Sequence, residues 1–565
     1  MCIRDRVNNG VQGADGKISY LSDTLPEVSY MIDSIQKLAE SSHNGKVTLV
    51  THSNGGLVAK VLIQKLQELK AQGKSNLLDK VDKVIMISAP QLGSTDAITA
   101  LLHGYNINFL YGLVLDESHG RAMSSNMPSV YNLLPSQKYF DLIKEPIVNF
   151  ATSTDNLNFF SRIYGRNITD YDTLKKFLVG IDGRPKPVIT DTAAPDVLNQ
   201  NLLAQAEMQH SAIDSWQFPA SIEVTQVAGW GVQTVKGLQY SGNKSCWSDL
   251  LGIGCKDVLA MTPAFSVEGD GTVLYPSALQ GNDKQLYFNV RDYNSPDIGK
   301  NENRKHADIF ETDSIDELIK NILIGKTDLP QYITKTKPIT NDRLLVVSLT
   351  ASTTLTAKDA QGNRTGFVSN PNTTSDLKLI EQNIPNSFYA DFAGTKYVGV
   401  DTKSEAKITF QGSGYGTFNF TSTVTQGDGP ATVTTFTDIP VTPQMQGEVI
   451  NATSSAPMLA LDVDGNGTVD ATTTPTQSFD PILYLEVMKT TIDSFDLKKA
   501  QEKTLITKIN QLENLIKKGK IKNAEKQIQR FIKKIDRKGN KLRKVSIDER
   551  AQIVQMLTTL TNSLL

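Results

Sequence analysis

Long apolar runs and a strong excess of one charge are both missing from this sequence of 565 residues. No stretch reaches the roughly 18 apolar residues that a membrane-spanning helix requires. The formal net charge is −2 at pH 7, so the chain has no overall attraction for nucleic acid and no nucleic-acid partner is predicted. At roughly 100–200 residues per domain, the length predicts three or four domains.

Cysteine is scarce, with three residues in the chain. Cys2 lies in residues 1–6, a hexapeptide that continues no pattern and is interpreted as an artefact of assembly or cloning. Cys246 and Cys255 are too far apart for a C-x-x-C redox or zinc pair and have no histidine beside them. They predict a small loop closed by a disulfide, and two free buried thiols are the alternative.

The most informative stretch is residues 47–60, where a β-rich apolar run enters a tight polar turn and apolar residues then continue at helical spacing. Ser53 therefore stands where a strand becomes a helix, which is the position of a nucleophilic serine in a strand-turn-helix elbow. The residues two before and two after such a serine crowd together and favour small side chains. Gly55 meets this requirement and Thr51 departs from it, so an ordinary Ser/Gly turn is the alternative.

Two strand–helix units in succession predict an α/β domain over residues 7–328. A buried strand is expected at 84–87, and a further strand at 222–234. The segment between them, at about 95–220, is too long for a simple crossover. It is predicted to form a cap that supplies an apolar wall for acyl chains; an inserted subdomain without substrate contact is the alternative.

The C-terminal half has a different composition, rich in Thr, Ser, Val and Gly after a Lys/Thr/Pro linker. Short strand-like segments between turns predict a β-sandwich of the extracellular type over residues 340–485. Residues 487–565 carry apolar residues at helical spacing and a capping-box pair, Ser546 and Glu549. We expect a helical hairpin or bundle there.

This helical part is strongly basic: across residues 498–544, Lys and Arg outnumber Asp and Glu by about four to one. Such a bias suits contact with anionic cell-wall polymers or a membrane surface. A solvated face on a helical hairpin is the alternative interpretation.

A serine hydroxyl becomes a good nucleophile only when a histidine accepts its proton and a carboxylate orients that histidine. In α/β hydrolases the acid and the histidine follow the serine in that order. Of six histidines, only His306 lies both after Ser53 and beyond the predicted cap. The Gly-flanked Asp270 is the acid candidate, with Glu268 as its nearest competitor. Asp308 is so close to His306 in sequence that capping or solvation is expected of it.

At these residues the chain from about 20 to 325 resembles the lecithin:cholesterol acyltransferase family of α/β hydrolases, which includes bacterial lipases and phospholipid acylhydrolases. The matching pieces are residues 52–59 (HSNGGLVA), 88–94 (SAPQLGS), 127–136 (MPSVYNLLPS), 269–273 (GDGTV) and His306. The resemblance implies an α/β-hydrolase fold with Ser53 as nucleophile, Asp270 as orienting acid and His306 as base. It also implies lipid or other ester substrates and no cofactor for catalysis.

A tetrahedral oxyanion needs backbone donors, one of which comes from the residue after the nucleophile, here Asn54. The second donor belongs to a loop that in this family precedes the region present in this sequence. Only about 50 residues precede Ser53, and a hydrolase sheet normally has several strands there. We therefore expect an incomplete N-terminus, with a signal peptide outside this sequence, and an extracellular or cell-surface location.

A second motif lies in the β-rich part, at residues 462–473. Its first nine positions match a calcium loop, with oxygen side chains at positions 1, 3, 5 and 9, Gly at position 6 and a carbonyl at position 7. Position 12 is Thr473 in place of a bidentate Glu. The pattern predicts a weak structural Ca²⁺ site, against an Asp/Gly-rich turn; its ligands would be Asp462, Asp464, Asn466, Thr468 and Asp470.

The prediction from sequence is a secreted, serine-dependent lipid acylhydrolase or O-acyltransferase that works through an acyl-enzyme on Ser53. Hydrolysis and transfer share that acyl-enzyme and differ in the nucleophile that resolves it. The competing hypothesis is a catalytically incompetent surface or adhesion protein that retains a hydrolase-like scaffold. Convergence of Ser53, His306 and Asp270 within hydrogen-bond reach is the observation that separates the two.

Overall fold

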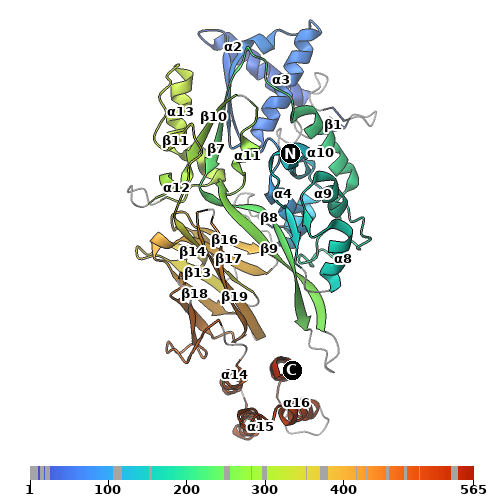
Figure 1. The fold of residues 1–565 in the computed structure, drawn as a ribbon, viewed down its shortest axis with the longest axis vertical. Coiled ribbons are helices and arrows are strands. Elements are labelled where there is room, and N and C mark those ends of the chain that lie inside the picture. The colour runs from blue at the N-terminus through green and yellow to red at the C-terminus, as the bar shows by residue number, and fades with distance from the viewer. Residues whose placement is uncertain are drawn as a thin grey trace. The chain divides into compact units, whose positions relative to one another are not determined.

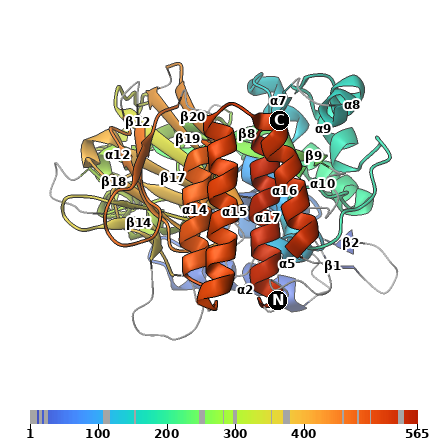
Figure 2. The same cartoon turned by 90° about the horizontal axis from the view of Figure 1, so that it is seen from below.

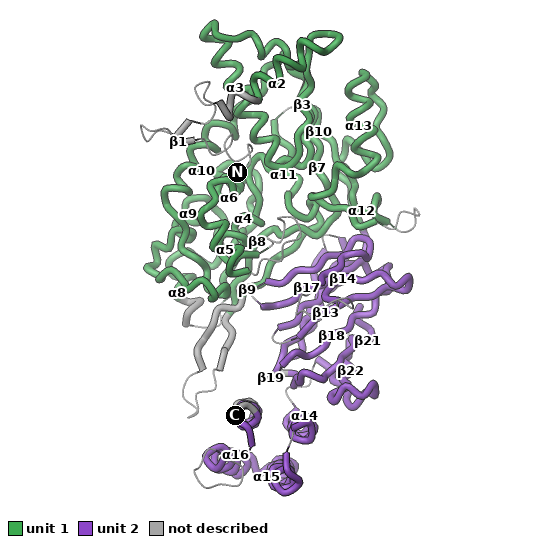
Figure 3. Tube along the Cα trace, turned by 180° about the vertical axis from the view of Figure 1, so that it is seen from behind, with its two compact units in different colours: residues 1–243, 257–340 green, residues 244–256, 341–565 purple. Residues whose placement is uncertain are grey.

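The structure of the chain, a computed structural model, divides into two compact units (Figure 3). Unit 1 comprises residues 1–243 and 257–340, and unit 2 comprises residues 244–256 and 341–565. Each unit has its own hydrophobic core. The structure describes residues 11–12, 18–19, 26–105, 117–151, 155–246, 255–281, 283–295, 302–350, 353–368, 379–392, 394–414, 416–427, 429–453, 457–475, 480–495, 497–535 and 545–564.

Unit 1 is built on a five-stranded sheet with the strand order β11-β10-β7-β4-β3 (Figure 1). β3, β4, β7 and β10 are parallel, and β11 is antiparallel to β10. Parallel strands joined through helices confirm the predicted α/β class for this unit. The bounds of the strands are β3 Val47–His52, β4 Val81–Ile87, β7 Glu223–Trp230, β10 Lys284–Asn289 and β11 Ile333–Thr334.

Helices cover both faces of this sheet, namely α2 (Pro26–Ser41), α3 (Gly55–Ala71) and α13 (Asp313–Leu323). The interior strand β4 is apolar at consecutive positions because both of its faces are buried. Val84 and Met86 share a core cluster with α2 and α3. Ile85 and Ile87 share another cluster with α13. The carboxyl ends of the parallel strands form the edge of the sheet at which α/β proteins place their binding and active sites.

A second sheet, with the strand order β6-β5-β8-β9, combines two strands of the long insertion after β4 with two strands that follow β7. Its strands are β5 Val148–Phe150, β6 Asn167–Ile168, β8 Val232–Cys246 and β9 Cys255–Gly269. The single strand expected at 222–234 is divided at Gly231, whose φ of +101° breaks the extended backbone. β7 stays in the main sheet and β8 joins β5, so the second sheet is completed by strands that lie beyond the predicted cap at about 95–220.

The remaining elements of unit 1 are short strands and helices around these two sheets. They are β1 Val11–Gln12, β2 Ile18–Ser19, η1 Leu77–Lys80, α4 Thr95–His103, α5 Glu117–Ser124, α6 Pro128–Tyr131, α7 Gln137–Leu142, α8 Asp155–Tyr164, α9 Tyr171–Leu178, α10 Gln200–Ile213, α11 Tyr275–Ala278, α12 Val290–Tyr293 and η4 His306–Glu311.

Unit 2 contains two antiparallel sheets whose inner faces share one apolar core. The first has the order β16 (Phe388–Phe392), β17 (Thr395–Asp401), β12 (Arg343–Leu349), β19 (Gly416–Gln426) and β20 (Thr432–Val441), with η5 (Thr402–Ser404) after β17. The second has the order β15 (Leu379–Gln382), β14 (Arg364–Val368), β13 (Thr353–Lys358), β18 (Lys407–Gly412), β21 (Gln446–Ile450), β22 (Met458–Asp462) and β23 (Ala471–Thr473). Alternating strands of this kind bury one face and solvate the other.

Four helices end the chain and lie side by side (Figure 2). They are α14 Pro481–Asp493, α15 Lys499–Lys517, α16 Ile521–Ile535 and α17 Ile547–Leu564. The predicted capping box is confirmed: Glu549 N–H donates to Ser546 Oγ, and Ser546 N–H donates to the Glu549 carboxylate. Apolar residues of these helices belong to the same core cluster as the two sheets. None of the described helices is long and apolar enough to cross a membrane.

Candidate active site

Ser53 occupies the turn between β3 and α3. Its φ of +54° lies in the left-handed region, which is uncommon for a residue with a side chain. The Ser53 N–H donates to the Ile87 carbonyl of the neighbouring strand at 3.0 Å, and this bond anchors the turn to the sheet. The strained backbone places Ser53 at the carboxyl edge of the sheet, at the start of α3.

The two glycines after the serine have different surroundings. A Cβ added at Gly55 would lie 3.5 Å from the Thr51 Cβ, which is ordinary contact. A Cβ at Gly56 would lie 2.4 Å from the Ala89 Cβ, too close for any real contact. The close approach of helix to sheet therefore falls on Gly56. Thr51 is accommodated because its hydroxyl turns to the Ile85 carbonyl at 3.2 Å.

The structure brings Ser53, His306 and Asp270 together. His306 Nε2 lies 2.9 Å from Ser53 Oγ, and His306 Nδ1 lies 2.8 Å from Asp270 Oδ2. The His306 N–H also donates to the Asp270 carbonyl at 2.8 Å, so backbone and side chain hold the pair. Both side chains are almost completely buried.

The two competing carboxylates lie elsewhere. Glu268 pairs with Lys337 at 2.7 Å. Asp308 accepts the Lys305 N–H at 2.7 Å, the capping role expected of it. Neither carboxylate is bonded to His306 among the described residues, where Asp270 takes that place.

The Asp270 carboxylate is surrounded by donors. Its Oδ1 accepts the Thr272 N–H at 3.1 Å and the Val273 N–H at 2.8 Å. Burial alone would raise the pKa of this carboxyl group, but the charge and hydrogen bond of His306, the Val273 N–H and the Ser88 hydroxyl hold the pKa below its ordinary value. Asp270 is therefore an ionised carboxylate around neutral pH.

Ser88 is a residue of this site to which the sequence analysis assigned no role. It follows β4 directly, is fully buried and has a φ of +50°. Its Oγ accepts the Gly229 N–H at 3.2 Å and hydrogen-bonds to Asp270. Gly229 leaves room for the acid, since a Cβ there would lie 2.6 Å from the Asp270 Cβ. The sequence signal was a polar residue at the end of the neighbouring strand, inside one of the family-like pieces.

Three of the family-like pieces are joined by hydrogen bonds to main-chain carbonyls. Ser94 Oγ donates to the Thr272 carbonyl at 2.6 Å, beside the acid. The Ser94 N–H donates to the Leu133 carbonyl at 2.7 Å, and the Ser136 N–H donates to the Leu92 carbonyl at 3.0 Å. The segments 88–94 and 127–136 therefore support the loop that carries Asp270.

Aromatic rings flank the histidine. The His52 ring centroid lies 4.7 Å from that of His306, and the Phe310 ring meets His52 edge-on at 5.4 Å. The His52 ring therefore restricts the orientations open to the His306 imidazole, and Phe310 packs on His52.

Asn54, the expected oxyanion donor, lies between the serine and the first residue of α3 and is 5% exposed. Its backbone has helical angles, with φ of −53°. No second oxyanion donor is identified in the part of the chain that the structure describes.

Another buried histidine–aspartate pair occurs in the insertion. His210 Nδ1 lies 2.8 Å from Asp214 Oδ1, but His210 Nε2 faces the Asn132 carbonyl at 2.9 Å. Because both ring nitrogens are occupied by structural bonds, this pair links α10 to the segment 127–136 instead of activating a nucleophile.

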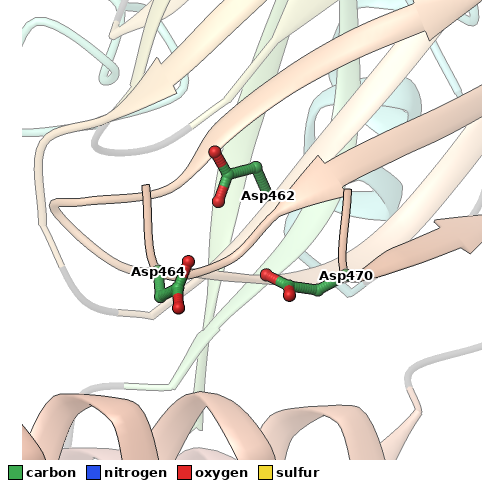
Figure 4. A group of neighbouring side chains, drawn as sticks. All are labelled: Asp462, Asp464 and Asp470. Atoms are coloured by element: carbon green, nitrogen blue, oxygen red, sulfur yellow. The ribbon is translucent and has the colours of Figure 1, made fainter. Parts of the chain in front are cut away.

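The predicted calcium loop connects β22 to β23, so strands flank it where a helix–loop–helix site has helices. Ligand oxygens of Asp462, Asp464 and Asp470 lie within 4.8 Å of one another (Figure 4). The Asp462 carboxylate accepts the N–H groups of the three residues 465–467, which folds the loop around it. Such a set of hard oxygen donors fits Ca²⁺. Thr473, at position 12, pairs with Leu459 in the sheet.

Cys246 is the last residue of β8 and Cys255 the first of β9, which are neighbouring strands. Their side chains lie outside what the structure describes, so the disulfide stays a prediction.

Residues 29–285 match the family model described as lecithin:cholesterol acyltransferase, and residues 485–562 match the model described as FIMAH domain. No curated protein matches the chain. Similar solved structures include the Tle4–Tli4 complex, at 16% identity over 45% of this chain and 55% of that one, with a TM-score of 0.27. Another is the Bacillus licheniformis lipase BlEst2 in its propeptide form, at 10% identity over 80% and 91%, with a TM-score of 0.27.

The class defined by the fold and the family match is that of α/β hydrolases. Over residues 29–285, a little under half of its length, the chain is similar to the lecithin:cholesterol acyltransferase family of lipid acyl hydrolases and acyltransferases. The chain spans about half the length of the Tle4–Tli4 chain that it matches.

Proposed function

We propose that this protein is a serine-dependent lipid acylhydrolase or O-acyltransferase with Ser53 as nucleophile, His306 as base and Asp270 as orienting acid. The observation that carries the proposal is the continuous bond chain from Ser53 Oγ through both His306 nitrogens to Asp270. This convergence supports an enzyme over the non-catalytic scaffold. Lipid esters are the substrate class because the family acts on lipid acyl groups.

In the proposed reaction, the Asp270 carboxylate accepts the Nδ1–H of His306, which leaves Nε2 unprotonated and facing Ser53. Nε2 takes the hydroxyl proton as Ser53 Oγ bonds to the ester carbonyl carbon, and the carbonyl oxygen becomes an oxyanion. The Asn54 N–H is the proposed donor to that oxyanion. When the ester C–O bond breaks, the leaving alcohol takes the proton from Nε2. Water or an acceptor alcohol then releases the acyl group by the same steps in reverse.

The test is the rate of ester hydrolysis by the full chain and three variants, measured with p-nitrophenyl acyl esters of increasing chain length. Ser53→Ala and His306→Ala are expected to lower kcat by about 10⁴-fold or more, since triad members act as a unit. Ser41→Ala, an exposed serine at the end of α2, serves as the matched control and retains full activity. If Ser53→Ala hydrolyses esters at the wild-type rate, Ser53 is not the nucleophile.

We also infer that residues 462–470 hold a structural Ca²⁺ ion, with no part in the ester chemistry. Support comes from the three clustered carboxylates (Figure 4) and from the ligand spacing. Titration calorimetry is expected to show Ca²⁺ binding that disappears in Asp464→Ala, whose carboxylate otherwise bonds only to Asn466 among the described residues. If titration of the stably folded protein with Ca²⁺ produces no binding heat, the proposed calcium site is wrong.

We propose that the C-terminal helices contact an anionic lipid surface, which would bring the enzyme to its substrate. Lys522, Lys526, Arg530 and Lys533 repeat at helical spacing along α16 and are exposed. Co-sedimentation of the full chain with phosphatidylglycerol vesicles, but not phosphatidylcholine vesicles, is expected. Charge reversal at Lys522 and Lys526 should abolish it, and Lys74→Glu should not. Retention on cell walls in place of vesicles would assign the helices to wall polymers.

An extracellular or cell-surface location is proposed as well. The support is the pair Cys246 and Cys255 at facing ends of neighbouring strands, because disulfides persist in oxidising compartments. Intact-mass measurement of protein secreted into the medium should show the loss of two hydrogens relative to the reduced chain. Two free thiols in secreted protein would contradict the disulfide.

A further inference from the structure

The outer face of the seven-stranded sheet in unit 2 carries two straight rows of side chains across four strands. The register pairs residues of β13, β18, β21 and β22 directly opposite one another, and opposite residues point to the same face. The first row is Thr356, Thr409, Glu448 and Ala460, and the second is Thr354, Gln411, Gln446 and Asp462. The intervening positions, among them Leu355, Val449 and Leu461, face the core.

These rows form the floor of a hollow of about 430 Å³. Ala460 is the smallest residue of its row, so the floor is low at this point. Gly467 and Val469, from the loop after β22, line one side. The loop that carries the calcium-type motif therefore forms one side of the hollow. The shape of the hollow depends on this loop being folded.

The groups offered to a ligand are mostly neutral and polar. The cation in the hollow, Lys407, is paired with Glu448 at 2.7 Å. The Asp462 carboxylate is occupied by backbone N–H groups of its own loop. The exposed amides of Gln411 and Gln446 remain to face a ligand. The hydroxyls of Thr356 and Thr409 already donate to backbone carbonyls, so they offer a ligand acceptor oxygens.

The residues that line the hollow favour some classes of ligand over others. A phosphate or nucleic-acid ligand requires unpaired cations, and the lining cation is paired. An acyl chain requires a mostly apolar lining. Here polar side chains outnumber the four apolar ones, which are Phe367, Phe410, Ala460 and Val469. Carboxamides that donate and accept, beside threonine oxygens that accept, match a ligand with a hydroxyl on nearly every carbon.

We propose that this hollow binds a neutral oligosaccharide laid across the strands. Three strand spacings of about 4.8 Å separate β13 from β22, so the two rows extend over roughly 14 Å. The amides of Gln411 and Gln446 lie adjacent in the second row and provide the central hydrogen bonds. The site is independent of the ester chemistry and would attach the enzyme to a glycan-bearing surface.

The test is affinity gel electrophoresis of the full chain in gels that contain laminarin, xylan, mannan or hydroxyethylcellulose, with a heparin gel as the anionic comparison. Retardation by at least one neutral polysaccharide is expected. Loss of both amides in the double variant Gln411→Ala/Gln446→Ala should weaken that binding by about tenfold or more. Gln426→Ala, an exposed glutamine at the end of β19, is the matched control and binds like the wild type.

Three results would overturn the proposal: no retardation in any neutral gel, equal retardation of the double variant, or retardation by heparin alone. The last would assign glycan binding to the basic helices. An unchanged melting temperature of the double variant shows that lost binding reflects lost contacts and not lost folding.

Discussion

At the scale of single residues, the site depends on two residues with strained backbones at the ends of adjacent strands. Ser53 and Ser88 both have positive φ, and they follow β3 and β4 directly. Such conformations cost of order 1–3 kcal/mol and persist where the surroundings hold them. Ser53 N–H bonds to β4 and Ser88 N–H bonds to β7, so the parallel sheet itself holds both turns.

Ser88 is expected to act as a positioning residue for Asp270. Ser88→Ala removes one donor to the carboxylate, so kcat should fall by about tenfold with KM unchanged. Because that donor favours the ionised form, its loss raises the pKa of Asp270, and the acid limb of kcat/KM should move to higher pH. Steady-state kinetics over a pH series checks both effects.

Ser88→Gly provides the control, since glycine tolerates the positive φ but also lacks the hydroxyl. If the hydroxyl matters, Ser88→Gly loses as much activity as Ser88→Ala. Recovery of wild-type kcat in the glycine variant would instead show that the backbone conformation is the important feature.

The pair of glycines after the nucleophile gives a stability prediction. Gly56→Ala forces a Cβ to within 2.4 Å of Ala89 and should destabilise unit 1 by about 1–3 kcal/mol. Gly55→Ala meets only ordinary contact with Thr51 and should be neutral or slightly stabilising, because alanine favours helices. Urea unfolding of both variants measures the difference. Equal destabilisation would refute the assignment of the close approach to Gly56.

At the scale of elements, helix α3 connects the elbow to the insertion through a buried lysine. Lys60 is 3% exposed, and its Nζ lies 3.4 Å from the Ile213 carbonyl at the end of α10. Gln64 donates to the Ala212 carbonyl at 3.0 Å beside it. These side chains satisfy carbonyls that the helix end leaves without intrahelical partners.

Burial lowers the pKa of Lys60 from its ordinary value of 10.5 to about 8, against the opposing charge of Asp214. Between these two values the unfolded chain binds a proton that the folded chain does not, so folding stability rises with pH there. Below about pH 8 both states are protonated, and the buried charge costs its full penalty. Relative to Lys60→Met, the wild type should therefore gain about 2–3 kcal/mol between pH 8 and 10.

Urea unfolding at a series of pH values tests this, with Lys74→Met, an exposed lysine, as the reference for the general effect of pH. If Lys60→Met and Lys74→Met show the same pH dependence, then Lys60 is not the group responsible.

Some features of the site and of the fold could be predicted from the sequence, and others could not. The elbow, Asp270 and His306 carry local signals, namely a strand-to-helix switch, a Gly-flanked turn and a loop before an amphipathic helix. Ser88 carries only a weak signal, a polar residue at the end of a strand, because its contribution is a tertiary hydrogen bond to a residue far along the chain. The break at Gly231 also escaped prediction, since apolar β-formers continue on both sides and only the positive φ moves β8 into the other sheet.

At the scale of the whole molecule, the two units have separate cores, so they are expected to unfold in two transitions. Calcium at 10 mM should stabilise only unit 2, by about 1–3 kcal/mol for a weak extracellular-type site. Differential scanning calorimetry with Ca²⁺ or EDTA, together with esterase rates, checks this. A shift of both transitions, or loss of esterase activity in EDTA, would contradict it.

The sequence anticipated the α/β character of the first unit from its strand–helix alternation. It did not anticipate that α14 shares a core with the sheets of unit 2, because an amphipathic helix does not reveal which surface it covers. The predicted boundary near residue 485 falls inside α14, which begins at Pro481. The oxygen-rich loop at 462–470 could be singled out because the spacing of its oxygen side chains is local, and its calcium ion stays a prediction.

The most direct test of the central claim is covalent labelling of the full chain with a fluorophosphonate, followed by peptide mass spectrometry. A serine activated by His306 attacks the phosphorus, whereas ordinary serines do not. The account predicts one adduct, on the peptide that contains Ser53, absent from Ser53→Ala and strongly slowed in His306→Ala. Absence of labelling, or labelling that persists unchanged in Ser53→Ala, would contradict the assignment of Ser53 as the nucleophile.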